Sequence, residues 1–161
     1  MDYRYDFFVS FTEADAAWAE WIAEQAERVR GVDDSPSTVL FQKWDFVPGT
    51  NWVTMIDNGV QQAARIIPVL TERYLRHCPY GTAEWQAVWQ NDPNGVDRRV
   101  LPVRVSKCDP TGLLGAIVYI DLADLSAAEA TTTLADGLHA AVHGRRSRRG
   151  VPFPGPDHPL A

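Results

Sequence analysis

Cysteine is scarce in this chain: Cys78 and Cys108 are the only two in 161 residues, and no paired spacing joins them. A disulfide framework is therefore excluded, and reduced thiols in the cytoplasm are expected. No apolar run approaches the roughly 20 residues that a membrane-spanning helix needs. The charged start, residues 1–6, does not have the form of a signal peptide. These absences predict a soluble, cytoplasmic protein without a membrane partner.

Positive charge is also scarce, since 15 Lys and Arg residues face 21 Asp and Glu residues and the net charge is −6. A general nucleic-acid binder is excluded because phosphate contact needs a basic face. The one dense basic run, residues 145–149, begins a proline-rich stretch without helical or strand period. We therefore predict one domain over residues 1–144, and over 145–161 an Arg- and Pro-rich linker to a downstream module.

Several catalytic and cofactor motifs are missing. The chain contains neither a phosphate-binding G-x-x-x-x-G-K-[ST] loop nor a G-x-G-x-x-G fingerprint. His139 and His143 have the spacing of two metal ligands on one helix face, but no third ligand accompanies them. Cys108 has no base partner nearby in the sequence. The sequence therefore predicts neither a metal site nor a resident cofactor.

The residues that are present alternate between strand and helix patterns. Apolar runs predict strands over residues 5–11, 38–41, 65–70, 99–105 and 116–120, with helices between them. This order predicts an α/β, three-layer, flavodoxin-like fold with a five-stranded, mostly parallel sheet and helices on both faces. Pro68 favours an edge position or a bulge for the third strand, because proline cannot donate to a ladder.

Four residues carry helix-end chemistry. Thr12 begins a T-x-x-D pattern that resembles a capping box, and Ser126 begins the S-x-x-E form. Asn51 is predicted to cap the helix that follows the Pro-Gly turn. Gly144 is predicted to end the last helix.

Ligands of parallel sheets bind beyond the carboxyl ends of the strands. That rule selects residues 10–12, the loop 44–49 (WDFVPG) and the segment after Leu70. Trp44 draws particular notice because no helix or strand period explains it. These segments are the candidate functional surface.

The same segments carry a family resemblance. YDFFVSF at residues 5–11 resembles the first box of the TIR (Toll/interleukin-1 receptor) domain, and WDFVPG at 44–49 resembles its BB loop. Tyr80 with Glu84 four residues later is similar to the aromatic-x-x-x-Glu motif of bacterial, NAD-cleaving members, in which the aromatic is usually tryptophan. The third box, often an FW pair, is not evident. The resemblance covers about residues 3–143 and implies the TIR fold.

The resemblance implies cleavage of the bond between nicotinamide and ribose in NAD+. Nicotinamide leaves as a neutral group, so one carboxylate that stabilises the oxocarbenium-like ribose can suffice. The implied catalytic residue is Glu84. The implied substrate contacts are Ser10 and Phe11 in the floor, Asp45 on a ribose hydroxyl, Lys43 or Arg76 on the pyrophosphate, and Trp44, Phe46, Trp52 and Tyr80 as stacking rings.

Two functions from different classes follow. In the first, the chain is an NAD+ glycohydrolase, with ADP-ribose cyclase as a further activity, that serves bacterial immune signalling or antiphage defence. Self-association through the loop 44–49 and a downstream oligomerisation or repeat module would activate it. In the alternative, the domain is a non-catalytic homotypic TIR–TIR module, and Glu84 only complements a helix macrodipole. A third reading is a domain that senses an NAD derivative without cleaving it.

Overall fold

The computed structural model describes residues 2–77, 86–146 and 150–156. Strands and helices alternate along this part of the chain, as predicted. The strands are β1 (Tyr5–Ser10), β2 (Val39–Leu40), β3 (Ala63–Leu70), β4 (Val103–Arg104) and β5 (Ile120–Asp121). The helices are α1 (Ala16–Glu27), α2 (Gln42–Asp45), α3 (Trp52–Gln62), α4 (Glu72–His77), α6 (Gly112–Gly115) and α7 (Ala127–His143), with the 3-10 turn η1 (Glu13–Asp15) before α1. Residues 86–91 are also helical.

The five strands form one sheet in the order β2-β1-β3-β4-β5, and every pair is parallel. Phe8 of β1 pairs with Leu40 of β2 on one side and with Ile66 of β3 on the other. This order is that of flavodoxin-like doubly wound folds. It confirms the predicted α/β fold class.

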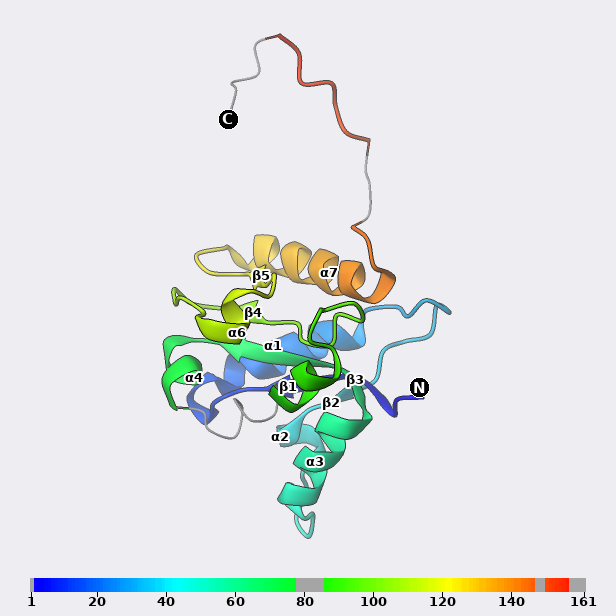
Figure 1. Ribbon diagram of the computed structural model, residues 1–161, viewed down its shortest axis with the longest axis vertical. Helices are drawn as coiled ribbons and strands as arrows, with labels where there is room; N and C mark the ends of the chain where they lie inside the picture. The colour runs from blue at the N-terminus through cyan, green and yellow to red at the C-terminus, as the bar shows by residue number, and fades with distance from the viewer. Residues whose placement is uncertain (1, 78–85, 147–149, 157–161) are drawn as a thin grey trace.

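Two apolar clusters bury the two faces of the sheet. On one face, α1 and α7 cover Phe7, Val9 and other strand residues that point toward them. On the other face, side chains of α3, α4, α6 and residues 86–91 cover Phe8, Leu40 and their neighbours. In Figure 1 the strands are stacked from β5, next to α7, to β2, above α3, and α1 lies behind them. The alternation of Phe7 and Phe8 between the clusters follows from the two-residue side-chain period of a strand.

The position of β3 corrects one prediction. Pro68 suggested an edge strand or a bulge, yet β3 is the central strand and Pro68 lies in register with Ser10 of β1. The sheet accommodates the proline because pairing on its β4 side is interrupted there. An isolated bridge joins Ile66 to Val100, and regular pairing resumes between Val69 and Val103. The missing N–H of proline therefore falls in this interruption.

The fifth strand also differs from its prediction. The apolar run 116–120 suggested a strand, but β5 begins only at Ile120 and continues to Asp121. Val118 is 87% exposed, and the N–H of Ile117 bonds back to Leu114 O at the end of α6. The run was misassigned because its side chains line a cavity beside β5 instead of entering the sheet.

The helix ends confirm three of the four predictions. Ser126 and Glu129 form a complete capping box, Asn51 accepts a hydrogen bond from Thr54 N, and Gly144 closes α7 with φ 76°. The prediction for Thr12 is wrong. Its hydroxyl donates to Asp15 Oδ2 at 2.6 Å, and it makes no side-chain cap to the backbone of η1. The T-x-x-D pattern therefore builds a side-chain pair.

Beyond α7 the described residues 150–156 contain no helix or strand and lie away from the sheet (Figure 1). Val151 and Phe153 are exposed there. Among the described helices, none combines the length and apolar character that crossing a bilayer requires.

Candidate functional site at the carboxyl edge of the sheet

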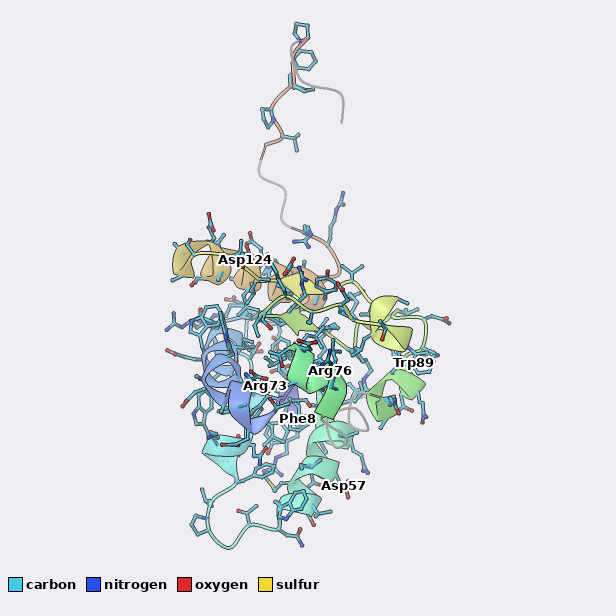
Figure 2. The ribbon with its side chains drawn as sticks, turned by 90° about the vertical axis from the view of Figure 1, so that its left-hand side faces the viewer. Phe8, Asp57, Arg73, Arg76, Trp89 and Asp124 are labelled. Carbon is cyan, nitrogen blue, oxygen red and sulfur yellow. The ribbon has the colours of Figure 1, made fainter. Side chains whose placement is uncertain are left out.

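The strand order places the topological switch point of the sheet between β1 and β3, where doubly wound folds have a crevice. From β1 the chain crosses to β2 on one side, and from β3 it crosses to β4 on the other. The loops that follow these two adjacent strands therefore diverge, and this divergence is where doubly wound sheets bind ligands. Figure 2 looks onto this edge of the molecule, with Arg73 and Arg76 of α4 near its centre.

Asp15 joins the two diverging loops. Its carboxylate is only 4% exposed, and Oδ2 accepts hydrogen bonds from Thr12 Oγ1 at 2.6 Å and Thr71 Oγ1 at 2.7 Å. The other oxygen, Oδ1, accepts from Arg73 Nη2 at 3.2 Å. A buried carboxylate needs such partners, because leaving it unpaired would cost several kcal/mol. The network therefore fixes the position of Arg73 at the rim of the crevice.

Ser10 and Phe11 lie at the end of β1, as the candidate floor requires. Ser10 Oγ and Tyr74 Oη are 3.0 Å apart, and both residues are buried. Tyr74 N also donates to Thr71 Oγ1, so α4 is tied to the same network. Phe11 packs against Phe41 with a centroid separation of 5.3 Å. These contacts make a rigid floor.

Trp44 has partners that the sequence did not indicate. It lies in the short helix α2, its ring meets Phe41 edge-on at 4.9 Å, and its Nε1 donates to Glu20 Oε1 at 3.0 Å. The expectation that no neighbouring element explains this tryptophan is therefore wrong, because α1 supplies Glu20. The ring remains 36% exposed, so part of it faces solvent.

Asp45 and Phe46 hold the loop in place. Asp45 Oδ2 accepts a hydrogen bond from Phe41 N at 2.7 Å, which commits one carboxylate oxygen to the backbone. Phe46 is half-buried against the cluster under α3. Both side chains therefore have structural contacts in addition to any contact with a ligand.

The loop beyond Phe46 exposes apolar surface. Val47 is 58% exposed, and Trp52 and Val53 at the start of α3 are 50% and 51% exposed. Gly49 has φ 93°, a conformation that favours glycine and turns the chain into α3. This end of the loop presents its side chains outward.

The cations Lys43, Arg73 and Arg76 lie beside the candidate crevice, and each has an acidic partner. Lys43 Nζ is 2.8 Å from Glu13 Oε1, Arg76 pairs with Glu72, and Arg73 pairs with Asp15. Of these three cations, Arg73 is the one whose partner among the described residues is a buried carboxylate. The sequence reading named Lys43 and Arg76 but missed Arg73, because nothing local links it to Asp15.

Tyr80 and Glu84 lie outside the described residues. The segment that contains them directly follows α4, which ends at His77, and helical structure is described again from residue 86. In the sequence, these two residues therefore follow closely after the helix that lies at the candidate crevice.

Arg104 and Asp121 form an ion pair where β4 and β5 end. They are register partners, and Arg104 Nη2 lies 2.7 Å from Asp121 Oδ2. The hydrogen bond from Arg104 lowers the pKa of Asp121 below its ordinary value of 3.8, and burial opposes this shift. The same bond raises the pKa of Arg104.

The described residues give little support for metal binding or for catalysis by a thiol. Over residues 2–77, 86–146 and 150–156, no three His, Cys, Asp or Glu side chains gather as metal ligands do. The rings of His139 and His143 stack on each other at 4.0 Å. Burial raises the pKa of the Cys108 thiol, which disfavours its reactive thiolate form.

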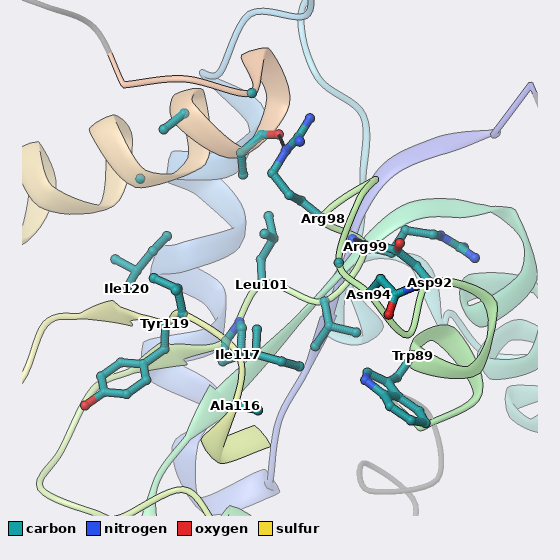
Figure 3. A pocket seen from close by; sticks show the side chains of 18 of the residues that line it. Trp89, Asp92, Asn94, Arg98, Arg99, Leu101, Ala116, Ile117, Tyr119 and Ile120 are labelled. Carbon is teal, nitrogen blue, oxygen red and sulfur yellow. Dashed lines mark hydrogen bonds between the residues drawn. The ribbon is translucent and has the colours of Figure 1, made fainter. Parts of the chain in front are cut away.

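A cavity of about 550 Å³ lies away from this edge, beside the start of β4 and the end of α7. Figure 3 shows Leu101 at its centre, Tyr119 and Ile120 on one wall and Trp89 on the other. Arg98 Nε donates to Ala141 O of α7 at 2.7 Å at its upper rim. This cavity is separate from the predicted site.

Comparison with known protein families assigns the chain to one of them. A family model described as TIR domain matches residues 7–135. The chain belongs to the TIR domain family. The TIR domain resembles Toll-like receptor 2 of Mus musculus, at 33% identity over 82 residues, and that of Cricetulus griseus, at 32% over 82 residues. Each match covers 49% of this chain and 10% of the receptor, so the chain spans a small part of these relatives.

Solved TIR structures share the fold. A metazoan TIR-STING receptor from C. gigas, solved with 2',3'-cGAMP, superposes with a TM-score of 0.66 at 17% identity over 86% of this chain and 40% of that one. The TIR domain of the Toll-related receptor TRR-2 from Hydra magnipapillata gives a TM-score of 0.53 at 16% identity, covering 73% of this chain and 83% of that one. The family is consistent with immune signalling, and its members include NAD+-cleaving enzymes.

Proposed function

We propose that this TIR domain is an NAD+ glycohydrolase of a cytoplasmic, bacterial immune signalling protein. The observation that carries the proposal is the Tyr80-x-x-x-Glu84 pattern, which directly follows α4 at the switch-point crevice of a TIR fold. Ligands of doubly wound sheets bind at such a switch point. A carboxylate in the segment that follows α4 is therefore a suitable candidate for stabilising the ribose.

The reaction needs one carboxylate. The glycosidic bond between ribose C1 and the pyridinium nitrogen breaks, and the electron pair goes to that nitrogen, so nicotinamide leaves neutral. Positive charge develops on the ribose, and the Glu84 carboxylate stabilises it. Water then adds to C1 and loses a proton, giving ADP-ribose. Attack by a group of the adenine ring instead of water gives the cyclic product.

Other residues supply the rest of the pocket. Ser10 and Phe11 form its floor, and Arg73, held by the buried Asp15, meets the pyrophosphate with a charge-assisted hydrogen bond. The free carboxylate oxygen of Asp45 takes a ribose hydroxyl. Aromatic rings stack on nicotinamide or adenine, worth roughly 0.5–2 kcal/mol for a cationic ring. Those rings are Trp44, Phe46, Trp52 and Tyr80.

Activation requires self-association. The loop 44–49 of one copy completes the pocket of the next, and residues 145–161 connect the domain, residues 1–144, to a downstream oligomerisation or repeat module. The cell would then lose NAD+, or gain a signalling nucleotide, as an antiphage response.

The second candidate function is a homotypic interaction module without catalysis. The exposed apolar side chains of Val47, Trp52 and Val53 favour it, because exposed apolar groups at a protruding loop suit a protein partner. In this case Glu84 stabilises the start of a helix only.

Nicotinamide release separates the two functions. The protein is clustered on a multivalent scaffold and incubated with NAD+, and nicotinamide is measured for the wild type and for Glu84→Gln. Glu84→Gln keeps the size of the side chain, and circular dichroism checks its fold. Activity of the wild type that is lost in the variant supports the enzyme; inactivity of the clustered wild type supports the interaction module.

A further inference from the structure

A second cavity lies at the opposite, amino edge of the sheet. Its volume is about 860 Å³, and it lies where β3 begins, beside α3 and residues 86–91. The candidate crevice begins where β1 and β3 end, so β3 separates the two sites. The side chains that line the cavity are Tyr3, Asp57, Val60, Gln61, Ala64, Arg65, Ala87, Asn91, Asp97, Arg98 and Arg99.

Three arginines among these residues have no acidic partner in contact. Across the described residues, no carboxylate lies within 4.0 Å of the side-chain nitrogens of Arg65, Arg98 or Arg99. Asp57 and Asp97 also line the cavity without forming such a pair. By contrast, Arg28, Arg73, Arg76 and Arg104 each form an ion pair with a carboxylate.

The hydrogen bonds of these arginines go to backbone carbonyls. Arg99 donates from Nε to Ala64 O at 3.2 Å and from Nη2 to Ala63 O at 3.0 Å. Its guanidinium carbon also lies 5.0 Å from the centre of the Tyr3 ring. Arg98 donates to Ala141 O and to Val96 O. Neutral carbonyls position these side chains without forming an ion pair.

Arg65 is the least satisfied of the three. A guanidinium has five donor hydrogens, yet Arg65 makes one long contact, from Nη2 to Asp97 O at 3.4 Å. Its Nε is buried and has no partner among the described residues, and the same holds for Gln62 Oε1 in the preceding helix. Burial lowers the pKa of Arg65 and the nearby Arg98 lowers it further, whereas Asp6, Asp97 and Tyr3 oppose this shift. A buried donor without a partner destabilises the fold, more so when it is charged.

An anion would compensate this charge. The planar fork of arginine matches the oxygens of a phosphate, with which it forms paired, charge-assisted bonds. The volume falls in the range of small-molecule sites, roughly 300–1,000 Å³, and so leaves room beyond one phosphate. The Gln61 and Asn91 amides and the Tyr3 ring can contact the remainder of such a molecule.

We propose that the cavity at the amino edge binds a small phosphorylated organic molecule whose phosphate contacts the terminal nitrogens of Arg65, with Arg98 and Arg99 adding positive charge. Because Nε of Arg65 is covered, the ligand meets Nη1 and Nη2. The site is distinct from the NAD+ crevice.

Adenosine diphosphate and inorganic pyrophosphate are suitable probes, at constant ionic strength. Calorimetry gives their affinities, and ¹⁵N NMR follows the Arg65 Nε–H, whose burial slows its exchange with water. We expect both probes to shift this resonance, tighter binding for the nucleotide, and at least tenfold weaker binding to Arg65→Met. Arg28→Met, at an exposed site outside both cavities, should bind as the wild type does.

Two results would overturn the site: equal binding by wild type and Arg65→Met, or a response that sodium chloride reproduces at the same ionic strength. An unshifted Arg65 Nε–H resonance, with binding lost in Arg73→Met, would also overturn it, because the probe would then bind in the crevice. If Arg65→Met does not fold, Arg65→Lys keeps the charge without the planar fork, and we expect it to bind pyrophosphate several-fold more weakly. Unchanged binding by that variant contradicts the proposed contact.

Discussion

Thr71 Oγ1 donates a hydrogen bond of 2.7 Å to the buried Asp15 Oδ2, across 56 residues of sequence. The bond joins the loop after β3 to the loop after β1, the two loops that diverge at the switch point. Arg73 completes the network from α4. The geometry of the candidate site therefore depends on a buried carboxylate. Water cannot reach it to replace a hydrogen bond that a protein partner no longer makes.

Asp15→Asn should destabilise the domain. The amide keeps one acceptor but places a donor against the hydroxyls of Thr12 and Thr71 and loses the charge that attracts Arg73. We expect a loss of about 1–3 kcal/mol in the free energy of unfolding, measured by urea denaturation at pH 7. Glu24→Gln, in an exposed helical pair with Arg28, is the matched control and should change it by less than about 0.5 kcal/mol. Equal stabilities of the two variants would contradict the role of the network.

Arg73→Met should weaken substrate recognition more than Lys43→Met. Arg73 is held by a buried carboxylate, whereas Lys43 pairs with an exposed one, so only Arg73 is preorganised toward the crevice. Losing a hydrogen bond from a charged group costs roughly 1.5–3 kcal/mol, so we expect KM for NAD+ to rise about tenfold or more. Steady-state kinetics of the clustered protein provide the measurement. A larger effect of Lys43→Met would assign the pyrophosphate to the loop side instead.

Val47→Asp should reduce self-association while leaving the fold intact. Val47 is 58% exposed in the loop 44–49, so a charge there is hydrated in the monomer but buried in a homotypic contact. Sedimentation at high protein concentration should show at least a tenfold weaker association. Val151→Asp, on the exposed tail, is the control and should associate normally. If Val47→Asp associates as the wild type does, the loop is not the contact surface.

The Arg104–Asp121 pair predicts a specific dependence of stability on pH. Because the folded-state pKa of Asp121 lies below its ordinary value of 3.8, the pair stabilises the fold above that value and loses this effect as pH falls through the folded-state pKa. Asp121→Asn should cost less than about 1 kcal/mol at pH 7, since the carboxylate is partly exposed. Urea denaturation from pH 7 to pH 2.5 should show the difference from wild type shrinking toward zero. A difference that grows on acidification would exclude this linkage.

Local chemistry was readable from the sequence, and contacts between distant segments were not. The caps at Asn51, Ser126 and Gly144 depend on three or four consecutive residues, and all three were predicted correctly. Thr71 and Arg73, which contact Asp15, and Glu20, which contacts Trp44, lie 24 to 58 residues away from them, so no local pattern could indicate these partners.

Tertiary structure also overrode two strand patterns. Pro68 suggested an edge, but the interruption between Ile66 and Val69 on the β4 side lets a central strand contain it. The run 116–120 has strand composition, yet its residues line a cavity before the short β5. The order of elements still predicted the sheet correctly, because alternating strands and helices leave few ways to cover both faces.

Nicotinamide release by clustered protein is the most direct test of catalysis by Glu84. Wild type and Glu84→Gln are assayed side by side at equal clustering, with urea denaturation to verify equal folding. We predict sustained release by the wild type and a decrease of at least a hundredfold in the variant, because the single carboxylate that stabilises the oxocarbenium-like ribose is gone. Equal release by a folded Glu84→Gln, or no release by clustered wild type, would contradict the account.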